Sequence, residues 1–388
     1  MRLVNTSSFE LVEFTEDEIP YGQYAVLSHR WTHDEVTFKE FRKGLKPQSI
    51  GYQKVVEACK YAKGRKRPYI WVDTCCIDKR SSAELSEAVN SMFRWYQRSA
   101  ECYVYLQDVV LPESHDDPVS LENLLKDCQW FKRGWTLQEL LAPAEVIFLT
   151  AQWTSLGTRQ DDEMATVVSQ ITSIGLYDLN NFNQQRPSVA RKMSWASRRT
   201  TTRPEDIAYC LLGLFDVSMP LLYGEGAGRA FMRLQQEVIR KSDDKSIFAW
   251  GQGTELGLVW YGLLAPSPAP FEHYGDIVVD DGNFENKYPY EMTNQGLSLR
   301  SQAEMLLGEG SEKFLIDLDC MKLASNRDGH LRRYRCYLIL EPITPDGRMY
   351  RRRHFAFGGL GEDVELKYPK EKRGPKVVKH FYVKQSGL

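Results

Sequence analysis

Short apolar runs alternate with amphipathic segments along the first 150 residues of the chain. Four runs have the length and composition of buried strands: residues 24–27, 69–72, 102–106 and 146–149. Between the first three of them, residues 52–61 and 84–97 carry apolar side chains at helical spacing. Because strands that alternate with helices form right-handed βαβ units, this pattern predicts a largely parallel sheet flanked by helices.

The pattern changes after this first part. Residues 160–250 are mostly helical in character, including a capping box, Thr202 to Glu205, that predicts a helix over 206–215. From about Gly251 onward, Pro and Gly separate short alternating runs, which is typical of an antiparallel sheet. We therefore predict an α/β domain over 1–155, a helical extension over 156–250 and a small antiparallel β domain over 251–388.

Composition narrows the class of protein. The chain has 388 residues, of which 42% are hydrophobic and 26% charged, as expected for folded domains. Its net charge of −2 gives no bias toward nucleic acid, which we regard as an unlikely partner. No apolar run approaches the length of a membrane span, and the N-terminus lacks a secretory pattern. We expect a cytoplasmic protein with reduced cysteines.

Polar residues gather just after three of the predicted strands. They are Ser28 to Trp31 after the first strand, Asp73 to Asp78 after the second, and Trp135 with Glu139 after the third. Ligands of parallel α/β sheets bind beyond the carboxyl ends of the strands, so these clusters predict a binding site. Each cluster also has a purely structural interpretation: an ion pair for Arg30, a turn cap for Asp73 and a core position for Trp135.

Trp135 and Glu139 have a spacing that would allow their side chains to act on the same ligand. Side chains four residues apart share one face of a helix, so the ring and the carboxylate would lie side by side. A ring beside an acid can hold a heteroaromatic leaving group and face the positive charge that develops as it departs. The same spacing is also common in packed helices.

Other motifs are weaker. Cys75 and Cys76 lack the spacing of a metal or redox site, so we predict buried thiols and no metal. The glycines of residues 224–228 lack the ending of a phosphate loop and are expected only to lead into a helix. The basic segments, 348–353 and 367–384, are expected to form solvated β-sheet surface, with an acidic partner or nucleic acid as the alternative.

Three sequence blocks together resemble a known family. Residues 24–31, 71–78 and 133–140 resemble, in order and spacing, the signature blocks of the fungal heterokaryon incompatibility (HET) domain. The resemblance covers roughly residues 20 to 150. It implies a role in fungal non-self recognition, in which the domain triggers programmed cell death.

The family also resembles TIR domains, which implies a flavodoxin-like parallel sheet. Residues 135–140 are similar to the TIR pattern Trp-Cys-x-x-Glu-Leu, with Thr136 in place of the cysteine. In active TIR domains this glutamate is catalytic for NAD⁺ cleavage. The resemblance therefore implies that Glu139 is catalytic, with Trp135 beside the nicotinamide and NAD⁺ as the substrate, without a separate cofactor.

The remaining residues receive roles that follow from their chemistry. Arg30 could hold a phosphate, Trp31 could stack on a base, and Asp73 and Asp78 could bind ribose hydroxyls. Ser28 belongs to the same predicted site. Two classes of function remain open: an NAD⁺ glycohydrolase activated by self-association into a homo-oligomer, or a non-enzymatic death-signalling scaffold. The scaffold would bind an incompatibility or immune-receptor partner protein.

Overall fold

The computed structural model describes residues 1–112, 119–251, 262–280, 288–306, 312–325, 330–357 and 373–385, with the backbone alone for 353–357. The chain divides into two compact units. The first comprises residues 1–186, 199–202 and 209–221, and the second comprises residues 187–198, 203–208 and 222–388. The predicted helical extension therefore contributes residues to both units.

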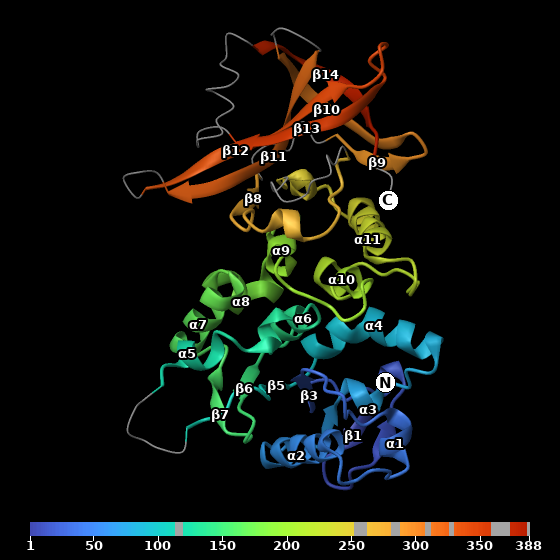
Figure 1. Cartoon of the computed structure of the whole chain (residues 1–388), viewed down its shortest axis with the longest axis vertical. Helices are drawn as coiled ribbons and strands as arrows, with labels where there is room; N and C mark the ends of the chain where they lie inside the picture. Colours follow the sequence, from blue (N-terminus) through green and yellow to red (C-terminus); the bar gives the residue numbers. More distant parts are fainter. Residues whose placement is uncertain are drawn as a thin grey trace. The chain divides into compact units, whose positions relative to one another are not determined.

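The first unit is built on a seven-stranded sheet in the order β2-β1-β4-β3-β5-β6-β7 (Figure 1). The strands are β1 (Arg2–Asn5), β2 (Leu11–Glu13), β3 (Tyr24–His29), β4 (Tyr69–Trp71), β5 (Glu101–Tyr105), β6 (Val146–Leu149) and β7 (Ser155–Thr158). The four central strands, β4-β3-β5-β6, are parallel, as the sequence predicts. The flanking strands β1, β2 and β7 pair antiparallel, because short turns join β1 to β2 and β6 to β7.

Helices fill the connections of this sheet. They are α1 (Phe38–Arg42), α2 (Ile50–Gly64), α3 (Asp73–Cys76), α4 (Ser82–Gln97), α5 (Leu121–Leu125), α6 (Thr136–Leu141), α7 (Asp162–Thr172) and α8 (Leu176–Asn181), with 3-10 turns η1 (Glu16–Glu18), η2 (Gln129–Lys132), η3 (Phe182–Gln184) and η4 (Gly213–Phe215). Ser49 and Ser81 cap α2 and α4 by accepting hydrogen bonds from backbone N–H groups. The predicted apolar stripe of α4 buries Val89 and Met92.

The second unit combines helices with an antiparallel sheet that closes on itself. Its elements are α9 (Val189–Ala196), α11 (Ala227–Lys241), η5 (Lys245–Phe248), η6 (Ala269–Phe271), β8 (Ile277–Val279), β9 (Tyr290–Thr293), β10 (Gly296–Leu306), β11 (Lys313–Ser325), β12 (Leu331–Pro342), β13 (Met349–Phe357) and β14 (Arg373–Val383). Strands β10 to β14 form a ring because β10 pairs with both β11 and β14. One short pairing, β13 with β14, is parallel. Phe314, Tyr350 and Phe381 pack edge to face in its core.

The helix predicted over 206–215 is broken into α10 (Asp206–Tyr209) and η4. The glycine segment leads into a helix as predicted: Gly226, with φ 84°, is the residue that precedes α11. Within the second unit, the carboxylate of Glu205 accepts hydrogen bonds from the N–H groups of Gly224 and Gly226, at 2.9 and 3.0 Å. This segment therefore binds a side chain of its own unit.

The basic segment 348–353 is only partly solvated, which corrects the prediction. Arg352 is 3% exposed, donates to the Phe248 carbonyl and lies over the ring of Trp250 at 3.5 Å. Burial of its apolar stem and the cation–π contact make it part of the core. In the second predicted basic segment, residues 367–372 lie outside the described residues, and Lys376 and Lys384, on and just after β14, are exposed as predicted.

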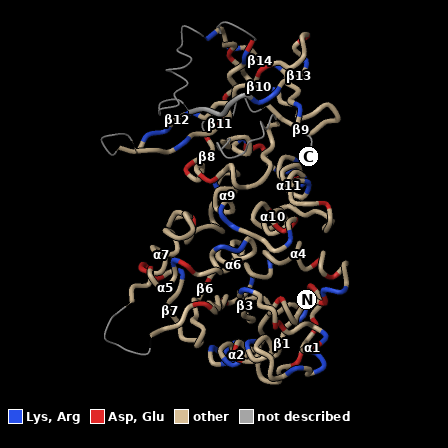
Figure 2. The backbone as a smooth tube through the Cα atoms, viewed as in Figure 1, with Lys and Arg blue, Asp and Glu red and all other residues tan. Residues whose placement is uncertain are grey.

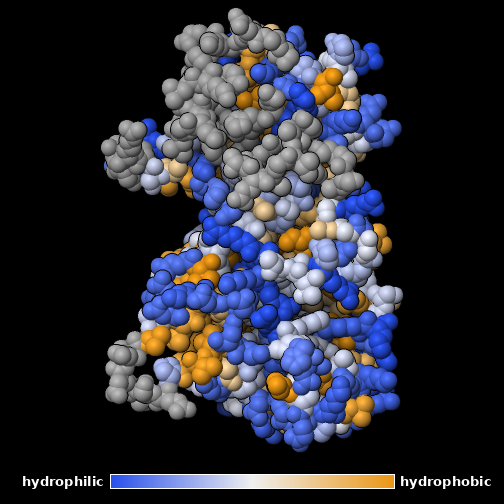
Figure 3. Space-filling model, in the orientation of Figure 1, coloured by the Kyte–Doolittle hydropathy of each residue, from blue (hydrophilic) through white to orange (hydrophobic). Residues whose placement is uncertain are grey.

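Charges of both signs are interspersed along the described chain, which matches the small net charge (Figure 2). Apolar side chains gather on one exposed area of the first unit (Figure 3). Val119, Leu176 and Tyr177, which precede α5 or begin α8, are among the exposed large apolar residues. In the described parts of the chain, no helix is both long and apolar enough to cross a membrane.

Candidate active site

The chain reverses its direction across the first sheet between β3 and β5. From β3 it passes to β4 on one side, and it then crosses to β5 on the other side of β3. The central strands are parallel in the order β4-β3-β5-β6, and ligands of open parallel sheets bind at the carboxyl ends of the two strands that flank such a reversal. Here those ends meet in register, with His29 opposite Tyr105.

A cavity of about 320 Å³ lies at this point. Its walls come from the segment after β3, the end of β5 and the turn η2: Arg30, Trp31, Thr32, His33, Tyr105, Gln107, Asp108 and Trp130. The walls therefore offer three aromatic rings, a guanidinium and a carboxylate. Arg30 and Trp31, both predicted as site residues, line this cavity. Arg30 is exposed and has no ion-pair partner among the described residues.

Glu139 lies just behind this cavity, joined to it through two side chains. The Ser28 hydroxyl donates to Glu139 Oε2, and the Trp130 indole N–H donates to Ser28 Oγ at 2.8 Å. Ser28 is at the end of β3, and Glu139 is in the first turn of α6. Glu139 is 8% exposed and does not itself line the cavity.

The environment of Glu139 shifts its titration strongly. Burial raises the pKa of Glu139 to about 7, against the Ser28 hydrogen bond, which lowers it. The charge of Asp73 adds to the increase, whereas Arg133 and the Tyr96 hydroxyl act against it. A carboxyl group that titrates near neutral pH beside a cavity is typical of functional sites.

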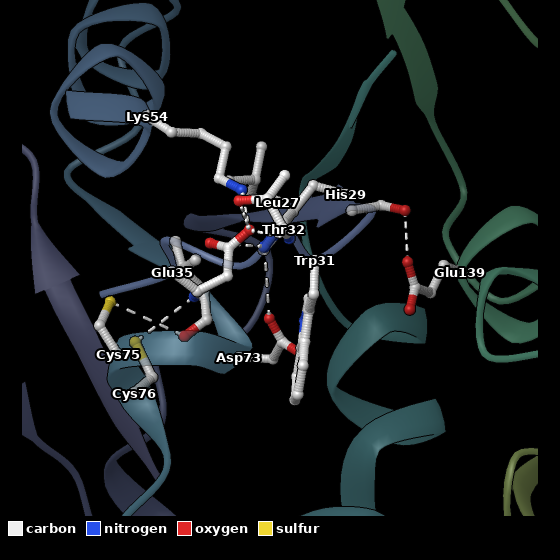
Figure 4. Close-up of polar contacts among 12 residues, drawn as sticks. Leu27, His29, Trp31, Thr32, Glu35, Lys54, Asp73, Cys75, Cys76 and Glu139 are labelled. Carbon is white, nitrogen blue, oxygen red and sulfur yellow. Dashed lines mark hydrogen bonds and ion pairs between the residues drawn. The ribbon is translucent and has the colours of Figure 1, made fainter. Parts of the chain in front are cut away.

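A buried charge cluster lies on the other side of the β3 end (Figure 4). It consists of His29, Glu35, Lys54 and Asp73. Lys54 Nζ is 2.5 Å from Glu35 Oε1, and His29 Nε2 lies 3.6 Å from Glu35 and 3.9 Å from Asp73. Burial and the charge of Lys54 lower the pKa of His29, so the imidazole is neutral at pH 7.

Trp31 connects this cluster to the cavity. Its indole N–H donates to Asp73 Oδ2 at 2.8 Å, and the ammonium of Lys79 lies over the ring, 3.3 Å from its centre. Although 42% of Trp31 is exposed, both its edge and one face are fixed. Such a pre-oriented aromatic ring at a cavity wall is suited to stacking on a ligand ring.

The structure thus brings together most of the predicted site. Ser28 meets Glu139, and Trp31 meets Asp73, so the three predicted clusters converge at the end of β3. Asp78 points elsewhere: it forms an ion pair with Arg80 at 2.6 Å and does not line the cavity. Trp135, at the N-terminal end of α6, is also outside the cavity lining.

Sequence reasoning missed several residues that shape the site. Trp130 and Tyr105 line the cavity, and Glu35 and Lys54 fix the buried charge cluster. Tyr105 lies one residue before the end of a predicted strand, 102–106, which could have pointed to it. Lys54 occupies an apolar face of α2, where a lone lysine could have indicated a buried partner.

Among the described residues, no cysteine lines the cavity, but the Cys102 thiol donates to the backbone carbonyl of Glu139 at 3.7 Å. All eight cysteines are buried free thiols, so Cys75 and Cys76 are buried as predicted. Among the described residues, no group of three or more His, Cys, Asp or Glu side chains could hold a metal ion.

Comparison with known proteins defines the class of the chain. A family model for heterokaryon incompatibility (HET) proteins matches residues 24–121, from β3 through the carboxyl ends of β4 and β5. The chain therefore contains a HET-domain sequence over these residues. Residues 229–258 match a second family, described as a domain of unknown function, DUF8212. Trp130 and Glu139 lie beyond the matched HET range.

The chain is also similar to a particular curated protein. It is 42% identical over 245 residues to the vegetative incompatibility protein HET-E-1 of Podospora anserina. The alignment covers 61% of this chain and 18% of that protein, so the chain spans about a fifth of the relative's length. No solved structure matches the chain.

Proposed function

We propose that the first unit cleaves NAD⁺ at the N-glycosidic bond to nicotinamide, with Glu139 as the catalytic carboxylate. The observation that carries this proposal is the position of Glu139. Its carboxyl group has a pKa of about 7 and accepts a hydrogen bond from Ser28 at the end of β3. It lies behind the cavity at the point where the strand order of the sheet reverses. The resemblance of residues 135–140 to the TIR pattern supports the same assignment.

The reaction requires few catalytic groups. The nicotinamide ring of NAD⁺ is already cationic, so it takes the electron pair of the breaking bond and leaves as a neutral base without a general acid. The ribose acquires oxocarbenium character, which an ionised Glu139 would stabilise electrostatically. A water oxygen then bonds to the ribose carbon and releases a proton, so the products of hydrolysis are nicotinamide and ADP-ribose.

The cavity supplies recognition groups for a nucleotide. In this proposal Arg30, at the cavity wall, binds a phosphate, and the free face of the Trp31 ring stacks on a base. At about 320 Å³ the cavity is at the lower end of small-ligand pockets, so a dinucleotide would extend beyond it. Because Glu139 does not line the cavity, catalysis requires a movement that opens the cavity toward this carboxylate. We propose that self-association of the first unit produces that movement.

The matches to incompatibility proteins support a proposed biological role. We propose that the chain acts in fungal non-self recognition and triggers cell death by depleting NAD⁺. The match to a vegetative incompatibility protein over 61% of the chain supports this role. Because the chain spans a small part of that relative, the trigger and any partner protein belong to the proposal as well.

A non-enzymatic scaffold is the second candidate. The low exposure of Glu139 and its hydrogen bond from Ser28 favour it, because a satisfied, closed carboxylate suits a structural role. Nicotinamide release by the purified protein distinguishes the two. Turnover that disappears in Glu139→Gln supports the glycohydrolase, and the absence of turnover in concentrated wild-type protein supports the scaffold.

A further inference from the structure

Three buried side chains from separate elements form a hydrogen-bond chain that ends at Glu139. Trp130 comes from η2, Ser28 from β3 and Glu139 from α6. Their exposed fractions are 1%, 0% and 8%. Trp130 is also the member that lines the cavity, so the hydrogen-bond chain runs from the cavity wall to the carboxylate.

The direction of each hydrogen bond is determined by chemistry. An indole N–H can only donate, so Ser28 Oγ accepts from Trp130. The single hydroxyl proton of Ser28 is then directed to Glu139 Oε2. An ionised carboxylate can only accept, so this arrangement is matched to ionised Glu139. Hydrogen bonds in such a series also strengthen one another.

Trp130 is itself held firmly. The Thr136 hydroxyl donates to the Trp130 carbonyl at 2.7 Å, and Arg199 donates to the same Thr136 oxygen at 3.0 Å. The indole ring packs edge to face on Phe131 and Phe148. Thr136 is the position at which the TIR pattern has a cysteine, so its hydroxyl has a structural use in this chain.

We propose that Trp130 and Ser28 are positioning residues for Glu139. Trp130 orients the Ser28 hydroxyl, and Ser28 holds the carboxylate in one orientation and in its ionised form. This inference rests on the proposed catalytic role of Glu139. Because Trp130 forms part of the cavity wall, a substrate in the cavity contacts the first member of the hydrogen-bond chain.

Removal of a side chain from this hydrogen-bond series should raise the pKa of Glu139. Burial raises the pKa of Glu139, and the Ser28 hydrogen bond opposes that increase. Without the hydroxyl, burial acts with less opposition, so the pKa should rise further. One hydrogen bond to a charged group corresponds to roughly one pH unit.

The test is an infrared difference titration of the Glu139 carboxyl group in the full chain, with Glu139→Gln to identify its band. Ser28→Ala removes the hydroxyl, and Trp130→Phe removes the indole N–H but keeps a ring on Phe131. Trp95→Phe is the matched control. Trp95 is also buried, but its Nε1 has no hydrogen-bond partner within the described residues.

We expect the midpoint to rise by roughly one pH unit in Ser28→Ala, to rise less in Trp130→Phe, and to stay unchanged in Trp95→Phe. In each variant, the acid limb of the pH profile of kcat/KM for NAD⁺ should move by the same amount as the infrared midpoint. An unchanged infrared midpoint in Ser28→Ala overturns the proposal, and an unchanged midpoint in Trp130→Phe overturns the part assigned to Trp130. Infrared shifts in a protein that never releases nicotinamide support the positioning role and contradict the proposed function.

Discussion

The hydroxyl of Ser28 donates a hydrogen bond to the carboxylate of Glu139, a residue 111 positions further along the chain. This contact joins the end of the first parallel strand to the first turn of α6. Glu139 is thereby fixed in a dry environment that disfavours its ionised form. Burial of the ionised Glu139 therefore destabilises the folded protein, and a catalytic role for Glu139 would explain why the residue is there.

Glu139→Gln should stabilise the first unit, and more so at high pH. The pKa of Glu139 is about 7 in the folded protein and ordinarily 4.5, so the folded state holds the proton more tightly. Its contribution to stability is present below pH 4.5 and is lost as the pH rises through 7. The advantage of the variant should therefore grow by about 3 kcal/mol between pH 4.5 and 8.

Urea unfolding, followed by hydrogen exchange in peptides from β3 and β5, measures this difference for the first unit alone. The comparison of variant with wild type at each pH cancels the titration of the other carboxylates. A constant difference across the pH range would show that Glu139 titrates normally in the folded protein.

Lys54→Met should destabilise the first unit strongly. The change leaves the buried carboxylate of Glu35 without its cation, and breaking a buried pair in this way typically costs about 3–5 kcal/mol. The double variant Lys54→Met with Glu35→Gln removes both charges and should recover much of the loss. Chemical denaturation of the four proteins checks this, and additive effects of the two changes would contradict the pairing.

Arg30→Ala should weaken NAD⁺ binding without affecting the fold. Arg30 is exposed at the cavity wall, and loss of one charge-assisted hydrogen bond to phosphate should weaken binding roughly tenfold or more. Arg80→Ala is the matched control, because Arg80 pairs with Asp78 outside the cavity lining. Both arginine substitutions are made in the Glu139→Gln protein, so that calorimetric titration with NAD⁺ measures binding without turnover. Equal affinity in both arginine variants would remove Arg30 from the site.

Trp31→Ala should also weaken nucleotide binding. Stacking on an aromatic side chain contributes about 1–3 kcal/mol per base, and the ring of Trp31 is already oriented by Asp73 and Lys79. Tyr177→Ala removes a similarly exposed ring from α8 and should have no effect. The same calorimetric titration with NAD⁺ measures both variants. If Tyr177→Ala weakens binding as much as Trp31→Ala, then Trp31 does not stack on the nucleotide.

Sequence patterns predicted the parallel centre of the first sheet because its strands are short, apolar and bounded by helices. They missed β1, β2 and β7, whose pairing depends on tertiary contacts rather than on an apolar run. At the site, the residues after the strands were found from their position alone. Trp130 was not, because its hydrogen bond to Ser28 joins residues 102 positions apart.

The most direct test of the account is nicotinamide release from NAD⁺ by purified protein over a range of concentrations, with Glu139→Gln alongside. The variant keeps the shape and the hydrogen bond from Ser28 but removes the negative charge. We expect turnover per subunit that rises with protein concentration and is lost in Glu139→Gln. Equal turnover in the two proteins would contradict the assignment of Glu139 as the catalytic carboxylate.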